Sequence, residues 1–383
     1  WHLADAASWE RVHGLDPATI WATKNAGRRE LVAEVRDRLG ADLLDPDVLT
    51  IGFARRFATY KRATLLLQYP DRLRALLRDP ERPVQFVFAG KAHPADHPGK
   101  ELIRQIHSFA QEADVRHRFV FLPDYDIGIA RTMYHGCDVW LNTPQRPMEA
   151  CGTSGMKAAL NGGLNLSIRD GWWDEMSTGD NGWDIPSLDD PDPARRDRRE
   201  ATAALDLIEG HLVPEFYARD EDGVPIGWAR RIATDWSTLG WNVTAGRMVR
   251  EYVTELYEPA AMAAAVAAAD DGASARELAA WIRGVTSAWS SVTIELDAGR
   301  SDLDDGRQER VRTVVAAIDH GDLRDDELEV QLVHGPLDDD GEFVDAELRV
   351  VVMTPDGTDG DAAAPAGPPR YRAGFSTGSA GPW

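Results

Sequence analysis

The stretch Val48–Arg62 reads VLTIGFARRFATYKR, in which a short apolar run ends at a cluster of basic residues. Val48–Phe53 has the length and composition of a buried strand. Similar runs recur at Val84–Ala89, Phe119–Leu122, Asp138–Leu141 and Leu164–Ile168, and segments with helical periodicity separate them at Ala63–Leu77, Glu101–Glu112, Ile127–Tyr134 and Met156–Leu160. Strands that alternate with helices predict an α/β fold with a mostly parallel sheet covered on both faces. Ligands of such a sheet gather at the carboxyl ends of its strands.

A helix is predicted before the first of these strands. Asp16 and Pro17 form an N-cap followed by proline in the first helical turn, and the amphipathic run to Leu39 stops at Gly40.

The chain changes character near residue 265. From Val266 onward it carries 24 acidic and 10 basic residues, against 40 and 32 in the first 265. Asn242–Leu256 has helical spacing, and Pro259 with an Ala-rich stretch is interpreted as a linker. The last part contains the apolar runs Val292–Leu296, Val311–Ile318, Leu328–Val333 and Leu348–Met353, separated by Asp/Gly turns, and a flexible insert at 360–369. We therefore expect two domains, 1–265 and a small, acidic, antiparallel β domain at 266–383.

Length and charge exclude several classes of protein. The chain has 383 residues with 43% hydrophobic content, enough for real cores, and a net charge of −22 that argues against nucleic-acid or anionic-membrane partners. Its two cysteines, Cys137 and Cys151, form no disulfide framework, which favours a reducing, cytoplasmic compartment. The chain opens at Trp1 without Met and closes within a predicted strand, so we expect it to be part of a longer protein, truncated in its last domain.

Basic residues follow the first predicted strand directly. Arg55, Arg56, Lys61 and Arg62 lie at its carboxyl end or in the next turn. Arg offers a planar fork of donors and Lys a compact charge, and both suit a phosphate group. The alternative is a solvated basic face, but four cations in eight residues of so acidic a chain favour an anion site.

A second cluster reads EACGTSGMKAALNGG, from Glu149 to Gly163. Small residues precede a helical run that begins at Met156, so backbone N–H groups at the helix start can face an anion, although many such turns only cap a helix. Lys157 is one of five lysines beside 37 arginines, which suggests a need for a primary amine, as in an imine. The alternative is an ordinary surface lysine.

The neighbouring residues leave further alternatives open. The Glu149 carboxylate can accept hydrogen bonds from sugar hydroxyls, or it can cap the helix or pair with an arginine. Asp170–Asp184 is rich in Trp, Gly and acids, typical either of a carbohydrate-contacting surface or of a loop whose tryptophans close the core. We assign Cys151 no nucleophilic role. His93 and His97 are each followed by proline, which argues against a metal site on one helix.

These two blocks resemble motifs of the α-glucan (glycogen, starch and maltodextrin) phosphorylases, particularly their compact bacterial branch. GFARRFATYKR resembles the basic motif K-R-x-x-x-Y-K-R, and EACGTSGMKAALNGG resembles the cofactor motif E-A-S-G-T-x-x-M-K. The likeness covers roughly 1–265. It implies the Rossmann-like C-terminal lobe of a GT-B glycosyltransferase-type fold, the cofactor pyridoxal 5′-phosphate, and phosphorolysis of α-1,4-glucan with retention, in which the cofactor phosphate exchanges a proton with inorganic phosphate.

The resemblance also implies roles for individual residues. Lys157 matches the lysine that forms an imine with pyridoxal phosphate, and Glu149 matches the carboxylate that contacts glucose. The positions around the cofactor phosphate are matched by Arg55, Lys61, Tyr125, Thr153 and Ser154. The groups that hold the substrate phosphate are matched by Arg56 and Lys61. The backbone groups that contact the sugar are matched by Cys151 and Gly152. We expect Arg56, Lys61 and Glu149 to serve catalysis. Asp126, where the family often has a basic residue, would repel an oxyanion unless it is turned away.

Two other functions remain as alternatives: a nucleotide-sugar glycosyltransferase of the glycogen-synthase type, and a noncatalytic carbohydrate-binding fragment. Lys157 separates the first from a phosphorylase, because those transferases commonly have a non-lysine residue there. The expected partners are α-glucan, inorganic phosphate and glucose 1-phosphate. Oligomeric state and regulation stay open, and we expect the isolated chain to be inactive without an N-terminal lobe.

Overall fold

The computed structural model of the chain describes residues 5–187, 190–297, 301–302, 310–336, 348–356 and 367–377. The chain forms two compact units, Trp1–Leu256 and Tyr257–Trp383. The first unit contains one sheet and the second contains two, and each unit is described by itself below.

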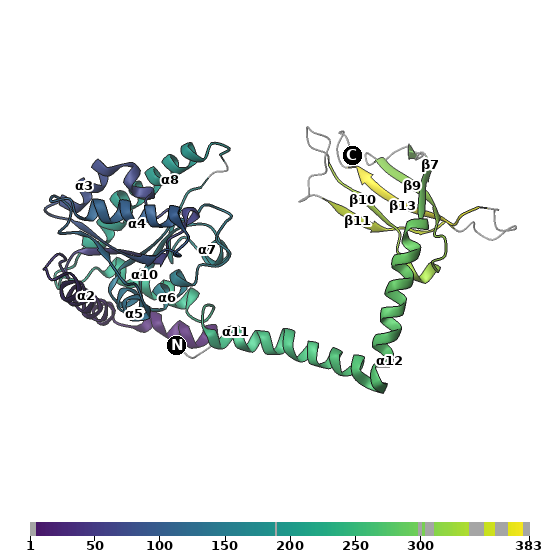
Figure 1. The fold of residues 1–383 in the computed structure, drawn as a ribbon, viewed down its shortest axis with the longest axis horizontal. Coiled ribbons are helices and arrows are strands. Elements are labelled where there is room, and N and C mark those ends of the chain that lie inside the picture. The colour runs from purple at the N-terminus through teal and green to yellow at the C-terminus, as the bar shows by residue number, and fades with distance from the viewer. Residues whose placement is uncertain are drawn as a thin grey trace. The chain divides into compact units, whose positions relative to one another are not determined.

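The first unit is built on a six-stranded sheet in which every neighbouring pair of strands is parallel (Figure 1). Its strands are β1 (Leu49–Arg56), β2 (Val84–Lys91), β3 (Phe119–Leu122), β4 (Val139–Asn142), β5 (Leu164–Ile168) and β6 (Gly182–Ile185), in the order β3-β2-β1-β4-β5-β6. The predicted parallel α/β fold is confirmed. The sixth strand was not foreseen, because it lies in the segment interpreted as a Trp-rich loop.

Helices cover both faces of this sheet. They are α1 (Ala6–Glu10), α2 (Pro17–Leu39), α3 (Pro70–Arg78), α4 (His97–Ala110), α5 (Ile127–Gly136), α6 (Thr153–Leu160), α7 (Trp172–Met176), α8 (Pro193–Leu207), α9 (Val213–Tyr217), α10 (Ile226–Leu239) and α11 (Ala245–Glu251), with short 3₁₀ or π segments at η1 (Arg11–Gly14), η2 (Thr59–Lys61), η3 (Leu65–Gln68), η4 (Ile208–Leu212) and η5 (Tyr252–Tyr257). Figure 1 shows α3, α4 and α8 on one face, and α2 and α5 on the other. Each face has its own apolar core, one around Phe53, Phe86 and Phe88 and the other around Val87 and Trp140.

Local signals explain where several helices begin and end. The Asp16 side chain accepts a hydrogen bond from the Ala18 N–H at the start of α2, and Gly40 ends it at φ +69°, as predicted. The single helix expected over Ala63–Leu77 is wrong. It is divided into η3 and α3 at Pro70, because proline lacks an N–H donor and disfavours helical backbone in the residue before it.

The second unit contains one long helical segment and two antiparallel sheets. Its elements are α12 (Glu258–Ala288), η6 (Trp289–Ser291), η7 (Asp325–Glu327), β7 (Thr293–Asp297), β8 (Ser301–Asp302), β9 (Arg310–Asp319), β10 (Gln331–His334), β11 (Arg349–Val352), β12 (Thr354–Pro355) and β13 (Arg370–Thr377). Five strands form one sheet, with the path β12-β13-β9-β7 and β8 on β9, and β10 pairs with β11. The predicted small antiparallel β domain is confirmed.

Two expectations for this part of the chain meet the structure differently. The Ala-rich stretch after Pro259, interpreted as a linker, is helical because alanine has the strongest intrinsic helix propensity, and non-helical residues interrupt α12 only at Ala269–Gly272. Most of the flexible insert expected at 360–369 lies outside the described residues.

Candidate functional site

Three charged side chains meet at the edge where the parallel strands have their carboxyl ends. Lys61 Nζ lies 2.6 Å from Glu149 Oε2, and Arg55 Nη1 lies 3.2 Å from the same oxygen. Arg55 is near the end of β1, Lys61 ends η2, and Glu149 lies between β4 and α6. The three side chains are only 6%, 10% and 11% exposed, respectively. We call them the Glu149 cluster.

Arg55 connects this cluster to the first turn of α6. Its Nη2 donates to Ser154 Oγ at 3.0 Å and also to Asn142 Oδ1. Asn142 Nδ2 donates to Asn165 Oδ1 at 3.0 Å, and Asn165 Nδ2 donates to the Gly155 carbonyl at 3.2 Å. Arg55 is therefore held by both strand ends and helix, which fixes the direction of its guanidinium.

The Arg55 guanidinium nevertheless keeps an open donor. Its Nε is buried and has no hydrogen-bond partner within the part of the chain that the structure describes. Burial lowers the pKa of Arg55, and the charge of Glu149 opposes that shift. Because an unpaired buried donor is costly, the site suits an additional oxygen ligand at this arginine.

Close packing shapes the turn that precedes α6. Gly152 has φ +94°, and a Cβ on Gly155 would lie 2.6 Å from Asn165 Oδ1 and 3.0 Å from the Trp172 ring. The Trp172 N–H donates to the Cys151 carbonyl at 2.9 Å, and the Glu149 N–H donates to Asp170 Oδ2 at 2.9 Å. The loop after β5 thus fixes this turn. That arrangement places Ser154, in the first turn of α6, where it accepts the hydrogen bond from Arg55.

A cavity of about 520 Å³ lies beside Lys157. We call it the Lys157 cavity; its lining residues are Tyr125, Asp126, Ile127, Ala130, Arg131, Tyr134, His135, Lys157 and Asn161. They come from α5 and the residues before it on one side, and from α6 and its C-cap on the other. Lys157 itself is exposed. The cavity therefore presents a primary amine next to aromatic walls.

Two tyrosines join the Lys157 cavity to the Glu149 cluster. Tyr125 and Tyr134 share a side-chain hydrogen bond, and burial raises the pKa of both phenols while the charge of Arg55 opposes the shift. Both hydroxyls therefore stay protonated at neutral pH. The charge of Arg55 influences both tyrosines, so these two side chains lie near that arginine as well as in the wall of the cavity.

Asp126 does not direct its carboxylate freely into this cavity. Its Oδ1 accepts a hydrogen bond from the Ile129 N–H at 2.9 Å and caps α5. That hydrogen bond, chiefly, lowers the pKa of Asp126. The acid expected to repel an oxyanion is turned toward the helix start.

Some residues predicted for the site make no hydrogen bond or ion pair with the Glu149 cluster. Arg56 is exposed at the end of β1, and Thr153 is exposed at the start of α6; neither side chain makes a hydrogen bond or ion pair to any described residue. Arg62 is buried elsewhere, because it pairs with Asp197 at 2.6 Å and with Glu200, and donates to the Thr143 and Pro144 carbonyls. Arg62 therefore stabilises the fold and is not open to an anion.

The open alternatives for the tryptophans and cysteines are decided by burial. Trp172, Trp173 and Trp183 are 5%, 0% and 7% exposed, so they close the core and offer no face to a sugar. Cys151 is half-buried and free, and burial together with Glu149 raises the pKa of its thiol. A raised pKa disfavours the thiolate, in keeping with a residue of no nucleophilic role.

Sequence analysis missed four residues of the site: Asn142, Asn165, Tyr134 and Asp170. Asn142 ends β4, and Asn165 is fully buried within β5. The available signal was a polar residue in a short buried strand, or just beyond its end, as Asp170 is two positions after β5. Ligand contacts in parallel sheets cluster at these places. Tyr134 had no such signal, since it lies in a helix.

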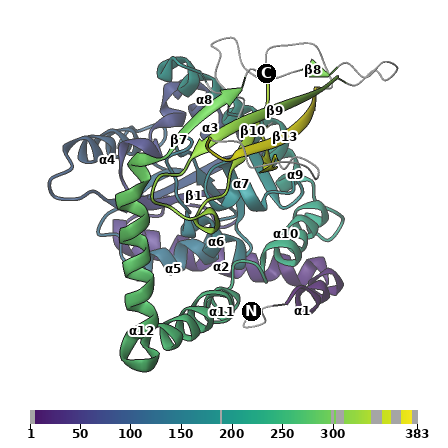
Figure 2. The same cartoon turned by 90° about the vertical axis from the view of Figure 1, so that its right-hand side faces the viewer.

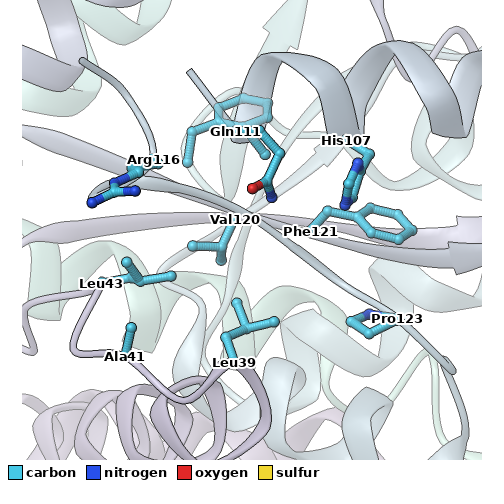
Figure 3. A pocket seen from close by; sticks show the side chains of 11 residues that line it. Leu39, Ala41, Leu43, His107, Gln111, Arg116, Val120, Phe121 and Pro123 are labelled. Atoms are coloured by element: carbon cyan, nitrogen blue, oxygen red, sulfur yellow. The ribbon is translucent and has the colours of Figure 1, made fainter. Parts of the chain in front are cut away.

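Another cavity, of about 370 Å³, lies along the open side of the edge strand β3. Leu39, Leu43 and Val120 line one part of it, and His107 of α4 and Gln111, the C-cap of that helix, lie across from them (Figure 3). It contains none of the predicted site residues. The described residues also include no group of His, Cys, Asp and Glu that could hold a metal ion, and no described helix is both long and apolar enough to cross a bilayer.

Comparison with known proteins connects this geometry to a family. Residues 17–178 match the family model described as carbohydrate phosphorylase. The chain is 48% identical over 357 residues to a glycogen phosphorylase of Mycobacterium tuberculosis, an alignment that covers 88% of this chain and 41% of that protein. It is 40% identical to a glycogen phosphorylase of Aquifex aeolicus, over 65% of this chain and 38% of that protein.

A third relative shows the same pattern of coverage. A maltodextrin phosphorylase of Thermococcus litoralis is 38% identical over 75% of this chain and 35% of that protein. The chain thus spans about two fifths of the length of the relatives it matches. Because the first unit ends at Leu256, an alignment over 88% of the chain also extends into the second unit, beyond the likeness expected from the motifs.

Proposed function

Because the chain belongs to the carbohydrate phosphorylase family, we propose that its first unit is the cofactor-binding catalytic lobe of an α-glucan phosphorylase. The reaction is phosphorolysis of α-1,4-glucan to glucose 1-phosphate with retention. The observation that carries the proposal is a primary amine, Lys157, in a cavity lined by Tyr125 and Tyr134, whose pKa values the charge of the buried Arg55 influences.

The residues of the Lys157 cavity fit pyridoxal 5′-phosphate. Lys157 supplies the amine that holds the aldehyde, and Tyr125 and Tyr134 line the wall. Arg55, whose buried Nε has no partner among the described residues, and Ser154 at the start of α6 would receive the phosphate, together with Thr153 and Lys61. When bound, the cofactor would supply a phosphate group able to exchange a proton with inorganic phosphate.

The chain's own residues would hold the substrates at the carboxyl edge of the sheet. Lys61 and Arg56 would bind inorganic phosphate, and Glu149 would accept hydrogen bonds from glucose hydroxyls, with the Cys151 and Gly152 backbone beside it. Two phosphates close together repel each other, and the cations of Arg55, Arg56 and Lys61 with the α6 N-terminus offset this repulsion. Lys61 already lies 2.6 Å from Glu149, so phosphate and sugar sites adjoin.

The alternatives make different use of the same edge. A nucleotide-sugar glycosyltransferase also needs cations for two phosphates but no amine in the adjoining cavity. A noncatalytic carbohydrate-binding fragment needs neither. The position of Lys157 in the wall of a cavity with two tyrosines supports the phosphorylase.

Partners and location follow from composition. The net charge of −22 supports a neutral glucan and small phosphates as ligands rather than nucleic acid or a membrane surface. Two free cysteines support a cytoplasmic location. The proposed reaction would place the protein in glycogen degradation.

Ligand-dependent stability tests the proposal. We expect pyridoxal phosphate to raise the unfolding temperature of the wild-type chain and not that of Lys157→Ala, because only binding to the native state stabilises it. Lys100→Ala, an exposed lysine on α4, is the matched control and should respond like wild type. Stabilisation by a nucleotide sugar in the absence of any response to pyridoxal phosphate would favour the transferase instead.

A further inference from the structure

A buried lysine lies beneath the Lys157 cavity. Lys24 is on α2, is 3% exposed, and donates from Nζ to three carbonyl oxygens. The acceptors are those of His135 at 2.8 Å, Cys137 at 3.0 Å and Asn161 at 3.3 Å. Figures 1 and 2 show α2, α5 and α6 side by side in the first unit. One ammonium group on α2 therefore contacts two other parts of the chain, at residues 135–137 and at Asn161.

These carbonyls are at the ends of two helices. His135 belongs to the last turn of α5, Cys137 is its C-cap, and Asn161 is the C-cap of α6. Carbonyls at a helix C-terminus have no partner within the helix, and a cation there is favourable. An ammonium has three donors, and Lys24 uses all of them in this way. No uncharged side chain of similar length offers three donors from one atom.

The packing around Lys24 leaves it little freedom. A Cβ on Gly162, at φ +70°, would lie 3.2 Å from Lys24 Cδ and from the Trp236 ring. Trp236 Nε1 donates to the Ala159 carbonyl at 3.0 Å, so α10 supports the same end of α6. The stem of Lys24 is thus enclosed, and its ammonium stays at the junction of the two helix ends.

The same helix ends form the two walls of the Lys157 cavity. Tyr134 and His135 belong to the α5 wall, and Lys157 and Asn161 to the α6 wall. Two of the three acceptors of Lys24, His135 and Asn161, are therefore lining residues. Their distances to one nitrogen atom fix the separation of the walls, and hence the place of the Lys157 amine relative to Tyr125 and Tyr134.

We propose that Lys24 is a positioning residue for the cofactor site: it holds the C-terminal ends of α5 and α6 together so that the Lys157 cavity keeps the shape that binds pyridoxal phosphate. The proposal rests on the proposed function for the identity of the ligand. Lys24 itself touches no cofactor. It acts through the backbone of the two helices.

Lys24→Met tests this, because methionine keeps the apolar stem and removes all three donors. Arg118→Met is the matched control, since Arg118 donates to the Leu77 and Asp79 carbonyls at the end of α3, on the other face of the sheet from α5. The first measurement is amide hydrogen exchange of the full chain without cofactor. We expect faster exchange at the ends of α5 and α6 in Lys24→Met, and no such change there in Arg118→Met.

The second measurement is retention of pyridoxal phosphate, followed by its absorption during dilution. We expect loss about tenfold faster in Lys24→Met than in Arg118→Met at equal fractions folded, which corresponds to about 1.4 kcal/mol. If Lys24→Met does not fold, Gly162→Ala disturbs the same junction through its contact with Lys24 Cδ and should show both effects.

The outcomes separate the two proposals. Faster exchange together with unchanged retention would overturn the positioning role and leave Lys24 a purely structural residue. Unchanged exchange at the ends of α5 and α6 in both Lys24→Met and Gly162→Ala would overturn the claim that Lys24 holds these helix ends together. Failure of the wild-type chain to take up any cofactor would overturn the proposed function and, with it, the link from Lys24 to cofactor binding. The exchange data would still show whether Lys24 holds the ends of α5 and α6 together.

Discussion

Lys61 Nζ lies 2.6 Å from Glu149 Oε2, and this ion pair joins the turn after β1 to the loop before α6. Arg55 reaches the same carboxylate oxygen at 3.2 Å. A single acid therefore pairs with two cations that the proposed reaction assigns to phosphate groups, and it offsets only one of their two positive charges. Glu149 competes with anions for these cations, in addition to its proposed role in binding glucose.

Removal of that competition should strengthen phosphate binding. In Glu149→Gln the shape is kept and the charge is lost, so we expect inorganic phosphate to bind about tenfold more tightly, while binding of glucose weakens. Isothermal titration of the wild type and the variant measures both. Glu175→Gln, on the short helix α7, is the control. Weaker phosphate binding in Glu149→Gln would show that the carboxylate organises the cations and does not compete.

Arg62 should matter for folding and not for anions. Its guanidinium is buried between Asp197 and Glu200, although Asp197 is 34% exposed and Glu200 also pairs with Arg196 at 3.0 Å. We expect Arg62→Met to lower the free energy of unfolding by about 1 to 3 kcal/mol in urea titrations, because it removes two ion pairs and the donors to the Thr143 and Pro144 carbonyls. The affinity of the folded variant for phosphate should equal that of wild type, and a clear drop would place Arg62 in the anion site after all.

The turn before α6 should reject a single methyl group. In Gly155→Ala the new Cβ would lie 2.6 Å from Asn165 Oδ1 and 3.0 Å from the Trp172 ring. Asn165, which donates to the Gly155 carbonyl and accepts from Asn142, must therefore shift. We expect a loss of about 1 to 3 kcal/mol in stability, with weaker uptake of pyridoxal phosphate. Gly210→Ala has open space around its Cβ and should lose neither. Equal behaviour of the two variants would contradict the packing argument.

The buried ammonium of Lys24 predicts a pH effect. Burial lowers the pKa of Lys24 from 10.5 to about 8; Asp138, Cys137 and Asp235 oppose this shift, and Arg28 adds to it. Between these two pKa values the unfolded chain binds more protons than the folded chain, so the contribution of Lys24 to stability rises with pH.

We therefore expect the stability difference between wild type and Lys24→Met to change in favour of wild type by about 2 kcal/mol from pH 7.5 to pH 9.5. Urea titrations at the two pH values measure it. A difference that is the same at both would mean that Lys24 keeps an ordinary pKa in the folded chain.

Signals within a few residues of one another predicted much of the fold. Asp16, Pro17 and Gly40 gave both ends of α2, and the apolar runs gave five of the six parallel strands, because caps and buried strands depend on local chemistry. The sixth strand, β6, was not predicted from local signals. Trp183 lies in it, and a segment rich in Gly and acids does not carry a strand pattern of its own.

The site was predictable where residue type and topology agree, as with Arg55, Lys61 and Glu149. It was not predictable where a partner far away in the sequence determines the role of a residue. Arg62 looks like its neighbours in sequence, but its acids lie on α8, more than a hundred positions away. Lys24 gave no signal at all, since its partners are backbone carbonyls that only the packed helices bring together.

The covalent state of Lys157 shows whether this chain binds pyridoxal phosphate at the proposed site. The chain is incubated with pyridoxal phosphate, reduced with borohydride, digested and analysed by mass spectrometry. The account predicts a stoichiometric pyridoxyl adduct on the peptide that carries Lys157, and none in Lys157→Ala. Scattered labelling of all five lysines, or no adduct at Lys157, would contradict it.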